Sequence, residues 1–111
     1  MPLKLNERAF AHAQQLIQNH RVDREGDWAT RKPTTESENQ FLADHSYEEY
    51  GNWFLAENTD ADPNTKERYE FPYGNFKTLC RSGLIAAEQR AGQYKHTEIE
   101  SAAKRLLEMI G

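Results

Sequence analysis

The sequence predicts a mainly α-helical fold, a single-domain bundle of four to five helices with one or two short extended segments. Three observations support this prediction. Two amphipathic helical patterns follow each other in the last third of the chain, and capping residues precede three further apolar runs. Only two short stretches show the alternation of apolar and polar residues, or the turn residues, that are typical of extended segments. The length of 111 residues is close to the commonest size of one domain, so we expect residues 1–111 to form a single helical domain.

The composition is that of a polar-surfaced protein with a modest core. Hydrophobic residues make up 37% of the chain and charged residues 29%, and the five Tyr, five Phe and two Trp argue against wholesale disorder. A single cysteine excludes an internal disulfide framework and a multi-cysteine zinc site. No window resembles a signal peptide or a membrane span, so we expect a cytoplasmic protein without membrane contact.

The net charge of −4 is unevenly distributed along the chain. Residues 1–74 carry 8 basic and 14 acidic side chains, a net of −6, whereas residues 75–111 carry 6 and 4, a net of +2. This acidic balance disfavours non-specific binding to nucleic acids, and it leaves open a local basic patch on the C-terminal third.

The first helix is expected at about residues 6–20, because Asn6 can act as its N-cap and apolar residues then recur on one face. The next region contains a tight turn around Gly26, flanked by Val22 and Trp28 in short extended pieces. Thr35-Glu36-Ser37-Glu38 matches a capping box that leads into a short helix.

Ser46-Tyr47-Glu48-Glu49 is another capping box, and it predicts a helix of about ten residues that includes Trp53 and Phe54. Residues 57–67 are polar and turn-rich, which indicates an exposed loop. Aromatic residues then alternate with polar ones over Tyr69–Tyr73. Because Pro72 cannot sit in a central strand, this stretch is predicted to be an edge segment.

The last third predicts a helical hairpin with two apolar stripes. The spacing i, i+3, i+4, i+7, i+8, i+11 occurs twice, over Phe76, Leu79, Cys80, Gly83, Leu84, Ala87 and Ala91, and over Ile99, Ala102, Ala103, Leu106, Leu107 and Ile110. Gly92 marks the end of the first helix, and a capping box at Thr97–Glu100 marks the start of the second. We expect this hairpin to form the centre of the core, with the first helix packed across it.

No residue pattern indicates a catalytic centre, a metal site or a cofactor. Cys80 lies on an apolar stripe, where a buried thiol is expected rather than a nucleophile. The four histidines are not spaced for joint metal binding, and the acidic turn around Gly26 lacks the length of a calcium loop. Glu48 and Glu49 could act as paired carboxylates, although adjacent helical residues diverge and a capping role is the expected one.

Basic and aromatic residues around the start of the hairpin form the most suggestive group. In the predicted helix Lys77 and Arg81 are i, i+4 neighbours, and such groups beside aromatic rings can hold phosphates or bases. The candidate binding residues are Phe71, Tyr73, Lys77, Arg81, Arg90 and Lys95. An ordinary solvated helix face beside a loop that covers the core would have the same composition.

Residues 69–110 also carry a resemblance to known sequences. The stretches Tyr69–Phe76, Arg81–Ala91 and Ile99–Ala103 are similar to a small family of uncharacterised bacterial proteins, and more distantly to a helical module beside phage head-maturation protease sequences. The resemblance implies an accessory or interaction module and assigns no catalytic or binding residue.

The preferred functional hypothesis is a non-enzymatic protein that binds another protein through the helical hairpin or the aromatic segment before it. The alternative is nucleic-acid or phosphate-ligand binding through a basic and aromatic face at Tyr73, Lys77 and Arg81. A third hypothesis is an enzyme that uses the carboxylates around Glu48. The sequence leaves the oligomeric state and the identity of the partner open.

Overall fold

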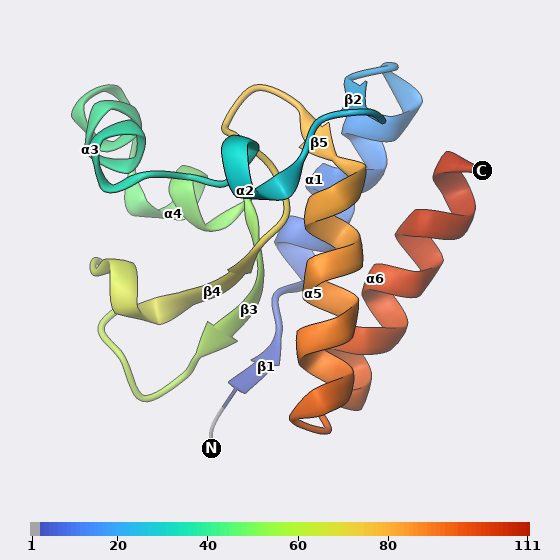
Figure 1. Cartoon of the computed structure of the whole chain (residues 1–111). Coiled ribbons are helices and arrows are strands. Elements are labelled where there is room, and N and C mark those ends of the chain that lie inside the picture. Colours follow the sequence, from blue (N-terminus) through green and yellow to red (C-terminus); the bar gives the residue numbers. More distant parts are fainter. Residues whose placement is uncertain (1–2) are drawn as a thin grey trace.

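The fold is α+β, which corrects the predicted mainly α-helical bundle (Figure 1). The computed structural model describes residues 3–111. In chain order their elements are β1 (Leu3–Leu5), α1 (Glu7–Gln18), β2 (Val22–Asp23), α2 (Trp28–Arg31), α3 (Thr35–Asp44), α4 (Tyr47–Gly51), β3 (Phe54–Asn58), the short 3-10 helix η1 (Lys66–Arg68), β4 (Tyr69–Pro72), β5 (Leu79–Cys80), α5 (Arg81–Gln93) and α6 (Thr97–Ile110).

A three-stranded antiparallel sheet accounts for most of the difference. Its strand order is β1-β3-β4, so the central strand is β3, at Phe54–Asn58. The sequence predicted the end of a ten-residue helix and the start of the exposed loop 57–67 at this position, and both predictions are wrong here. That helix, α4, ends at Gly51 instead. Phe54, Leu55 and Ala56 are all buried, which is typical of a strand covered on both faces, and such a strand shows no alternation in its sequence.

The second correction concerns the start of the C-terminal hairpin. The predicted helix from Phe76 begins only at Arg81, because the Asn75 side chain accepts hydrogen bonds from the backbone N–H groups of Lys77 (3.1 Å) and Thr78 (2.8 Å) and closes a turn. Leu79–Cys80 then forms β5, which pairs in parallel with β2. The chain beyond Tyr73 therefore contributes to a second, two-stranded sheet before it becomes helical.

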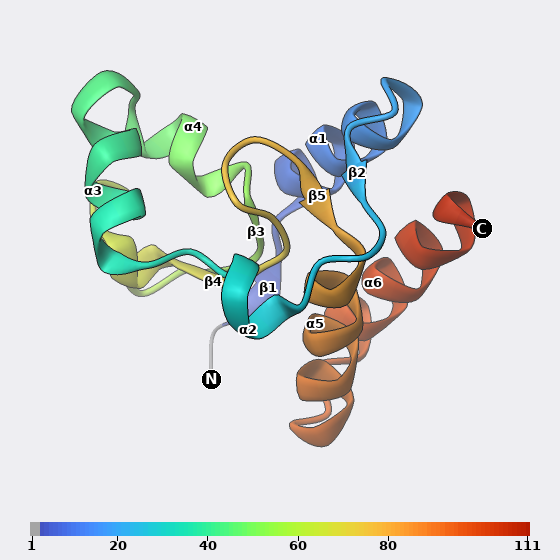
Figure 2. The ribbon, with the colours of Figure 1, turned by 45° about the horizontal axis from the view of Figure 1, so that its top comes forward.

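The helical hairpin itself is present. Helices α5 and α6 pack against each other near the turn that joins them and diverge towards the C-terminus (Figure 2). Leu84 and Leu106 are completely buried in the core. Leu107 is half-buried against the same cluster. Large buried side chains from the sheet side, such as Tyr50, Leu55 and Tyr73, belong to the same core, so the hairpin is one wall of the core rather than its centre.

The helix caps agree with the sequence in part. Asn6 caps α1 as predicted, and the predicted capping box of Ser46 and Glu49 is present at α4. The box before α3 lies one residue earlier than predicted and consists of Thr34 and Ser37. The box predicted at Thr97–Glu100 is absent from the described structure, where His96 is the N-cap of α6 and makes no side-chain capping bond.

Both predicted extended segments exist as short strands. Val22–Asp23 is β2, although Trp28 already belongs to the one-turn helix α2. Tyr69–Pro72 is β4, an edge strand, as the position of Pro72 required. Within residues 3–111, no helix has both the length and the hydropathy needed to cross a membrane.

Candidate functional site

Three of the six predicted binding residues surround one hollow. Phe71, Arg90 and Lys95 line a space of about 470 Å³ between the sheet and the α5–α6 turn. The Arg90 guanidinium lies 5.6 Å from the centroid of the Phe71 ring, and the His96 ring meets Phe71 edge-on at 6.0 Å. Phe71 is only 7% exposed and belongs to the core, so Arg90 and Lys95 are the members of this cluster that a partner can reach most easily.

The other three residues lie elsewhere. Tyr73 is 0% exposed, and its hydroxyl donates a 2.7 Å hydrogen bond to the backbone oxygen of Asn52. Burial also raises the pKa of Tyr73, so the side chain is a neutral part of the core. Lys77 and Arg81 are exposed, but they are not helical i, i+4 neighbours as predicted, because Lys77 belongs to the Asn75 turn before α5.

The backbone at Phe71 departs from that of a regular strand. Successive residues of a regular strand point to opposite faces of the sheet, yet both Glu70 and Phe71 line the hollow. Phe71 has φ = +65°, in the left-handed region that non-glycine residues seldom adopt. The register of β4 with β3 continues unchanged on both sides of Phe71, and the Phe71 ring lies beside Arg90 of α5.

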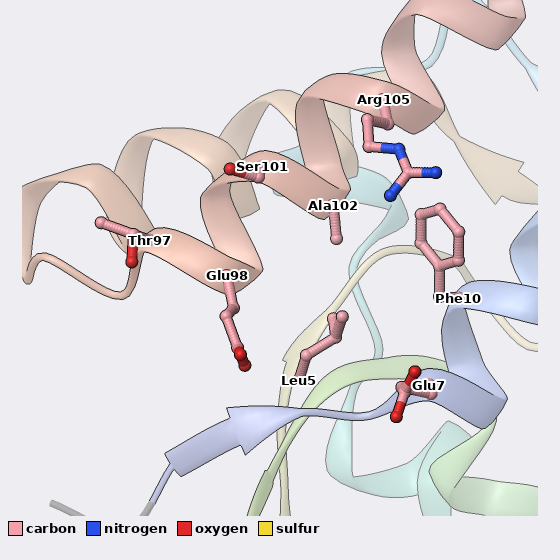
Figure 3. A pocket seen from close by; sticks show the side chains of 8 residues that line it. All are labelled: Leu5, Glu7, Phe10, Thr97, Glu98, Ser101, Ala102 and Arg105. Carbon is pink, nitrogen blue, oxygen red and sulfur yellow. The ribbon is translucent and has the colours of Figure 1, made fainter.

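The hollow continues into a groove that follows α6. A neighbouring hollow shares Leu3, Lys95 and His96 with it and lies between β1 and the first turn of α6. The next hollow has a volume of about 400 Å³ and lies between α6 and the β1–α1 junction, as Figure 3 shows. There Leu5 and Glu98 approach each other from opposite walls, and Arg105 lies over Phe10 at 5.1 Å.

We call these five adjoining hollows, which share lining residues, the edge groove. Its lining residues are Leu3, Lys4, Leu5, Glu7, Phe10, Gln14, Glu70, Phe71, Arg90, Tyr94, Lys95, His96, Thr97, Glu98, Ile99, Ser101, Ala102, Arg105, Glu108 and Met109. The two exposed large apolar side chains among the described residues lie near its ends, with Tyr94 60% exposed and Met109 41% exposed. From Thr97 to Met109 the groove follows α6 for roughly 18 Å.

The two ends of the edge groove carry opposite charge. Near the α5–α6 turn the lining contains the cations Lys4, Arg90 and Lys95 and the carboxylates of Glu70 and Glu98, a net charge of +1. Towards the far end it contains the carboxylates of Glu7, Glu98 and Glu108 and the cation Arg105, a net charge of −2, with Glu98 common to both ends. The macrodipole of α6 has the same polarity, since its positive N-terminus lies at the basic end.

The two side chains that the sequence analysis considered for catalysis, Glu48 and Cys80, do not line this groove. Glu48 is exposed and pairs with Arg8 at 2.7 Å, and the hydrogen bond from Arg8 lowers the pKa of the Glu48 carboxyl. Cys80 is a buried free thiol whose pKa is raised, first by burial and then by the charge of Asp23. Among residues 3–111, no cluster of three or more His, Cys, Asp or Glu side chains could hold a metal ion.

The sequence interpretation missed the residues contributed by β1 and α6. Leu3-Lys4-Leu5 alternates over only three residues, which is too short for a periodicity signal. On α6 a signal was present, because Thr97, Ser101 and Arg105 are four residues apart and form a polar line beside Ala102. In Figure 3 α6 forms the upper wall of the groove, and its Glu98 and Ala102 side chains point towards the opposite wall.

Comparison with known proteins does not supply a family for this chain. It matches no protein-family model, no curated protein and no solved structure. The resemblance of residues 69–110 to the bacterial family and to the phage-associated module therefore stays a prediction.

Proposed function

We propose that this chain is a non-enzymatic interaction protein that binds a partner protein in the edge groove. The observation that carries the proposal is the groove itself, which follows α6 and has an edge strand, β1, along its opposite wall. Exposed apolar groups beside charged ones are typical of protein-binding surfaces. The cytoplasmic location is part of the same proposal.

Nucleic-acid or phosphate binding has less support. The aromatic group that this hypothesis needs beside Lys77 and Arg81 is Tyr73, and its ring is buried. The net charge of −4 also opposes a phosphate backbone. An enzyme centred on Glu48 has little support too, because this carboxylate lies exposed in a surface ion pair with Arg8.

Site-specific photo-crosslinking in the producing cell tests the proposal. A photoreactive phenylalanine analogue replaces the exposed Ser101 in the groove or, as the control, the exposed Gln40 on α3. We expect a discrete protein adduct from position 101 and none of the same mass from position 40. Identical adducts from both positions, or adducts only with nucleic acid, would contradict the proposal.

A pair of matched variants makes the test quantitative. Ser101→Arg places a long cation in the groove, whereas Gln40→Arg makes the same chemical change on α3. We expect recovery of the cross-linked partner to fall at least about tenfold for Ser101→Arg, which corresponds to roughly 1.4 kcal/mol of binding free energy, and to stay unchanged for Gln40→Arg.

A further inference from the structure

The hydrogen-bonding pattern of β1 defines what the groove offers to a partner. The backbone N–H of Asn6 donates to the Leu55 oxygen at 2.8 Å, and Lys4 pairs with Glu57 in the same register. Hydrogen-bonded and non-hydrogen-bonded pairs alternate in an antiparallel ladder. The N–H and C=O groups of Leu3 and Leu5 therefore point away from β3, towards the outer edge of the sheet.

This outer edge opens into the edge groove. Lys4 and Leu5 line it together with Glu98, and Glu7 follows at the junction with α1. A polypeptide segment that lies there can pair with the outward groups of Leu3 and Leu5, and its alternate side chains then enter the hollow of about 400 Å³ beneath Ala102. At roughly 3.3 Å per residue, the groove along α6 has room for about five or six extended residues.

The charges of the groove fix the direction of such a segment. β1 runs from the basic end, at Leu3, towards the acidic end, at Glu7. A strand antiparallel to β1 therefore has its C-terminal residues beside Lys4 and Lys95 and its N-terminal residues beside Glu7. Charge complementarity favours acidic residues in the C-terminal half of the segment and a basic residue in its N-terminal half.

A second copy of the chain fits this edge less well. Antiparallel pairing of two β1 strands about a two-fold axis centred on Lys4 places the two lysines directly opposite each other. Like charges in this position destabilise a strand pair, and a lysine on an edge strand is a known means of preventing edge-to-edge association.

We propose that the edge groove takes an extended segment of a partner protein, which adds antiparallel to β1 as a fourth strand and carries acidic residues towards its C-terminal end. This inference rests on the proposed function and names the class of partner. Backbone hydrogen bonds to Leu3 and Leu5 supply affinity, while the charges of Lys4, Lys95 and Glu7 supply direction.

Selection from a random library of end-capped heptapeptides tests this inference directly. The bait is the whole chain, and the Ser101→Arg variant is the counter-selection. We expect enrichment of peptides with Asp or Glu in the last three positions, Lys or Arg in the first two, and small apolar residues at alternate positions. Three results would overturn the inference: no enrichment of any peptide, equal enrichment on the Ser101→Arg variant, or enrichment of peptides without this order of charges.

Variants of the chain then test the direction of the bound peptide and its backbone pairing with β1 separately. The best selected peptide is the probe. Lys4→Glu combined with Lys95→Glu should weaken binding at least about tenfold, and a peptide with reversed acidic residues should recover most of it. Leu5→Pro removes one outward N–H, and Leu5→Ala removes the same side chain while it keeps that N–H. Binding that falls equally for both substitutions would contradict strand addition.

N-methylation of the peptide backbone provides a test that leaves the protein fold untouched. Methylation at every second amide should abolish binding, while methylation at the intervening amides should leave it within about threefold, because only alternate amides face β1. Equal tolerance at all positions would overturn the inference. If position 101 still cross-links a partner in cells while these peptide tests fail, the proposed function stands and strand addition does not.

Discussion

At the scale of single residues, the surroundings of His12 disfavour its charged form. It is half-buried on α1, with its ring edge-on to Trp53 at 4.9 Å, and its buried Nε2 has no hydrogen-bond partner within residues 3–111. Burial lowers the pKa of His12, and the charge of Arg21 lowers it further. Protonation of this ring is therefore more favourable in the unfolded chain than in the native structure.

This difference predicts a pH dependence of stability. Because the unfolded chain binds a proton at His12 more readily, the free energy of unfolding should decrease as the pH falls below the ordinary histidine pKa of about 6.5. Chemical denaturation between pH 7.5 and 5 measures this slope, which should be smaller in a His12→Gln variant.

An unchanged slope in the His12→Gln variant would show that His12 does not cause the pH dependence.

Asp23 affects stability in a different pH range, so it does not contribute to the slope between pH 7.5 and 5. The backbone N–H groups of Gly26 and Glu25 lower the pKa of its carboxyl, so its contribution to stability is lost only as the pH falls below the ordinary aspartate pKa of about 3.9.

Residue-scale geometry also limits what could be predicted for the site. Phe71 and Tyr73 lie two residues apart in an alternating stretch, so the sequence assigned both to the same exposed segment. Phe71 has a left-handed backbone, and both rings are buried in the core, Phe71 at its edge beside the hollow and Tyr73 completely enclosed. Phenylalanine carries no sequence signal for a positive φ, unlike glycine or asparagine.

At the scale of elements, α1 and α5 end in the same way. In each helix the residue after the C-cap is left-handed although it is not glycine, with φ = 59° at His20 and 61° at Lys95. The following residue closes the motif, since the N–H of Arg21 bonds Leu16 and the N–H of His96 bonds Ala91, both at 2.8 Å. This is the pattern of a Schellman motif, in which glycine is preferred.

Glycine at these positions should therefore stabilise the fold. We expect His20→Gly and Lys95→Gly each to raise the free energy of unfolding by up to about 1 kcal/mol, measured by chemical denaturation. The two variants should differ in function, because only Lys95→Gly removes a cation from the edge groove. Weaker partner binding by His20→Gly, or a clear loss of stability in either variant, would argue against this account.

Two glycines of α5 test how closely α2 and the sheet approach the helical hairpin. A Cβ at Gly83 would lie 2.7 Å from the Trp28 ring and 2.9 Å from the Tyr73 backbone oxygen, whereas a Cβ at Gly92 would meet only the flexible carboxylate of Glu100. Gly83→Ala should destabilise the chain by about 1–3 kcal/mol. Gly92→Ala should be neutral or stabilising by up to about 1 kcal/mol, because alanine favours the helix. Equal effects in denaturation would contradict the close packing.

Amphipathic helices at the surface were the elements that the sequence predicted best. Both α1 and α6 follow their apolar stripes, since each has one buried face and one exposed face. The strands were missed for physical reasons: β3 is buried on both faces, and β5 continues an apolar spacing that helix α5 shares. At β5, the Asn75 turn and pairing with β2 override a local pattern that fits a helix.

At the scale of the whole molecule, the edge groove exists only because the two ends of the described chain meet. β1 supplies one wall and α6 the other, and the turn between α5 and α6 closes the basic end. No local periodicity contains this information, because neither wall is a binding surface alone. The sequence predicted three residues that line the groove, Phe71, Arg90 and Lys95, from their chemistry, whereas no pattern in Leu3–Leu5 indicated a strand.

Amide hydrogen exchange at β1 tests the central claim most directly. In the unbound chain the outward amides of Leu3 and Leu5 should exchange much faster than those of Lys4 and Asn6, which face β3. When a selected peptide saturates the groove, the amides of Leu3 and Leu5 should become protected, while Lys77 and Arg81 at the other end of α5 stay unchanged. Amides of Leu3 and Leu5 that exchange as fast in the complex as in the unbound chain would contradict the account.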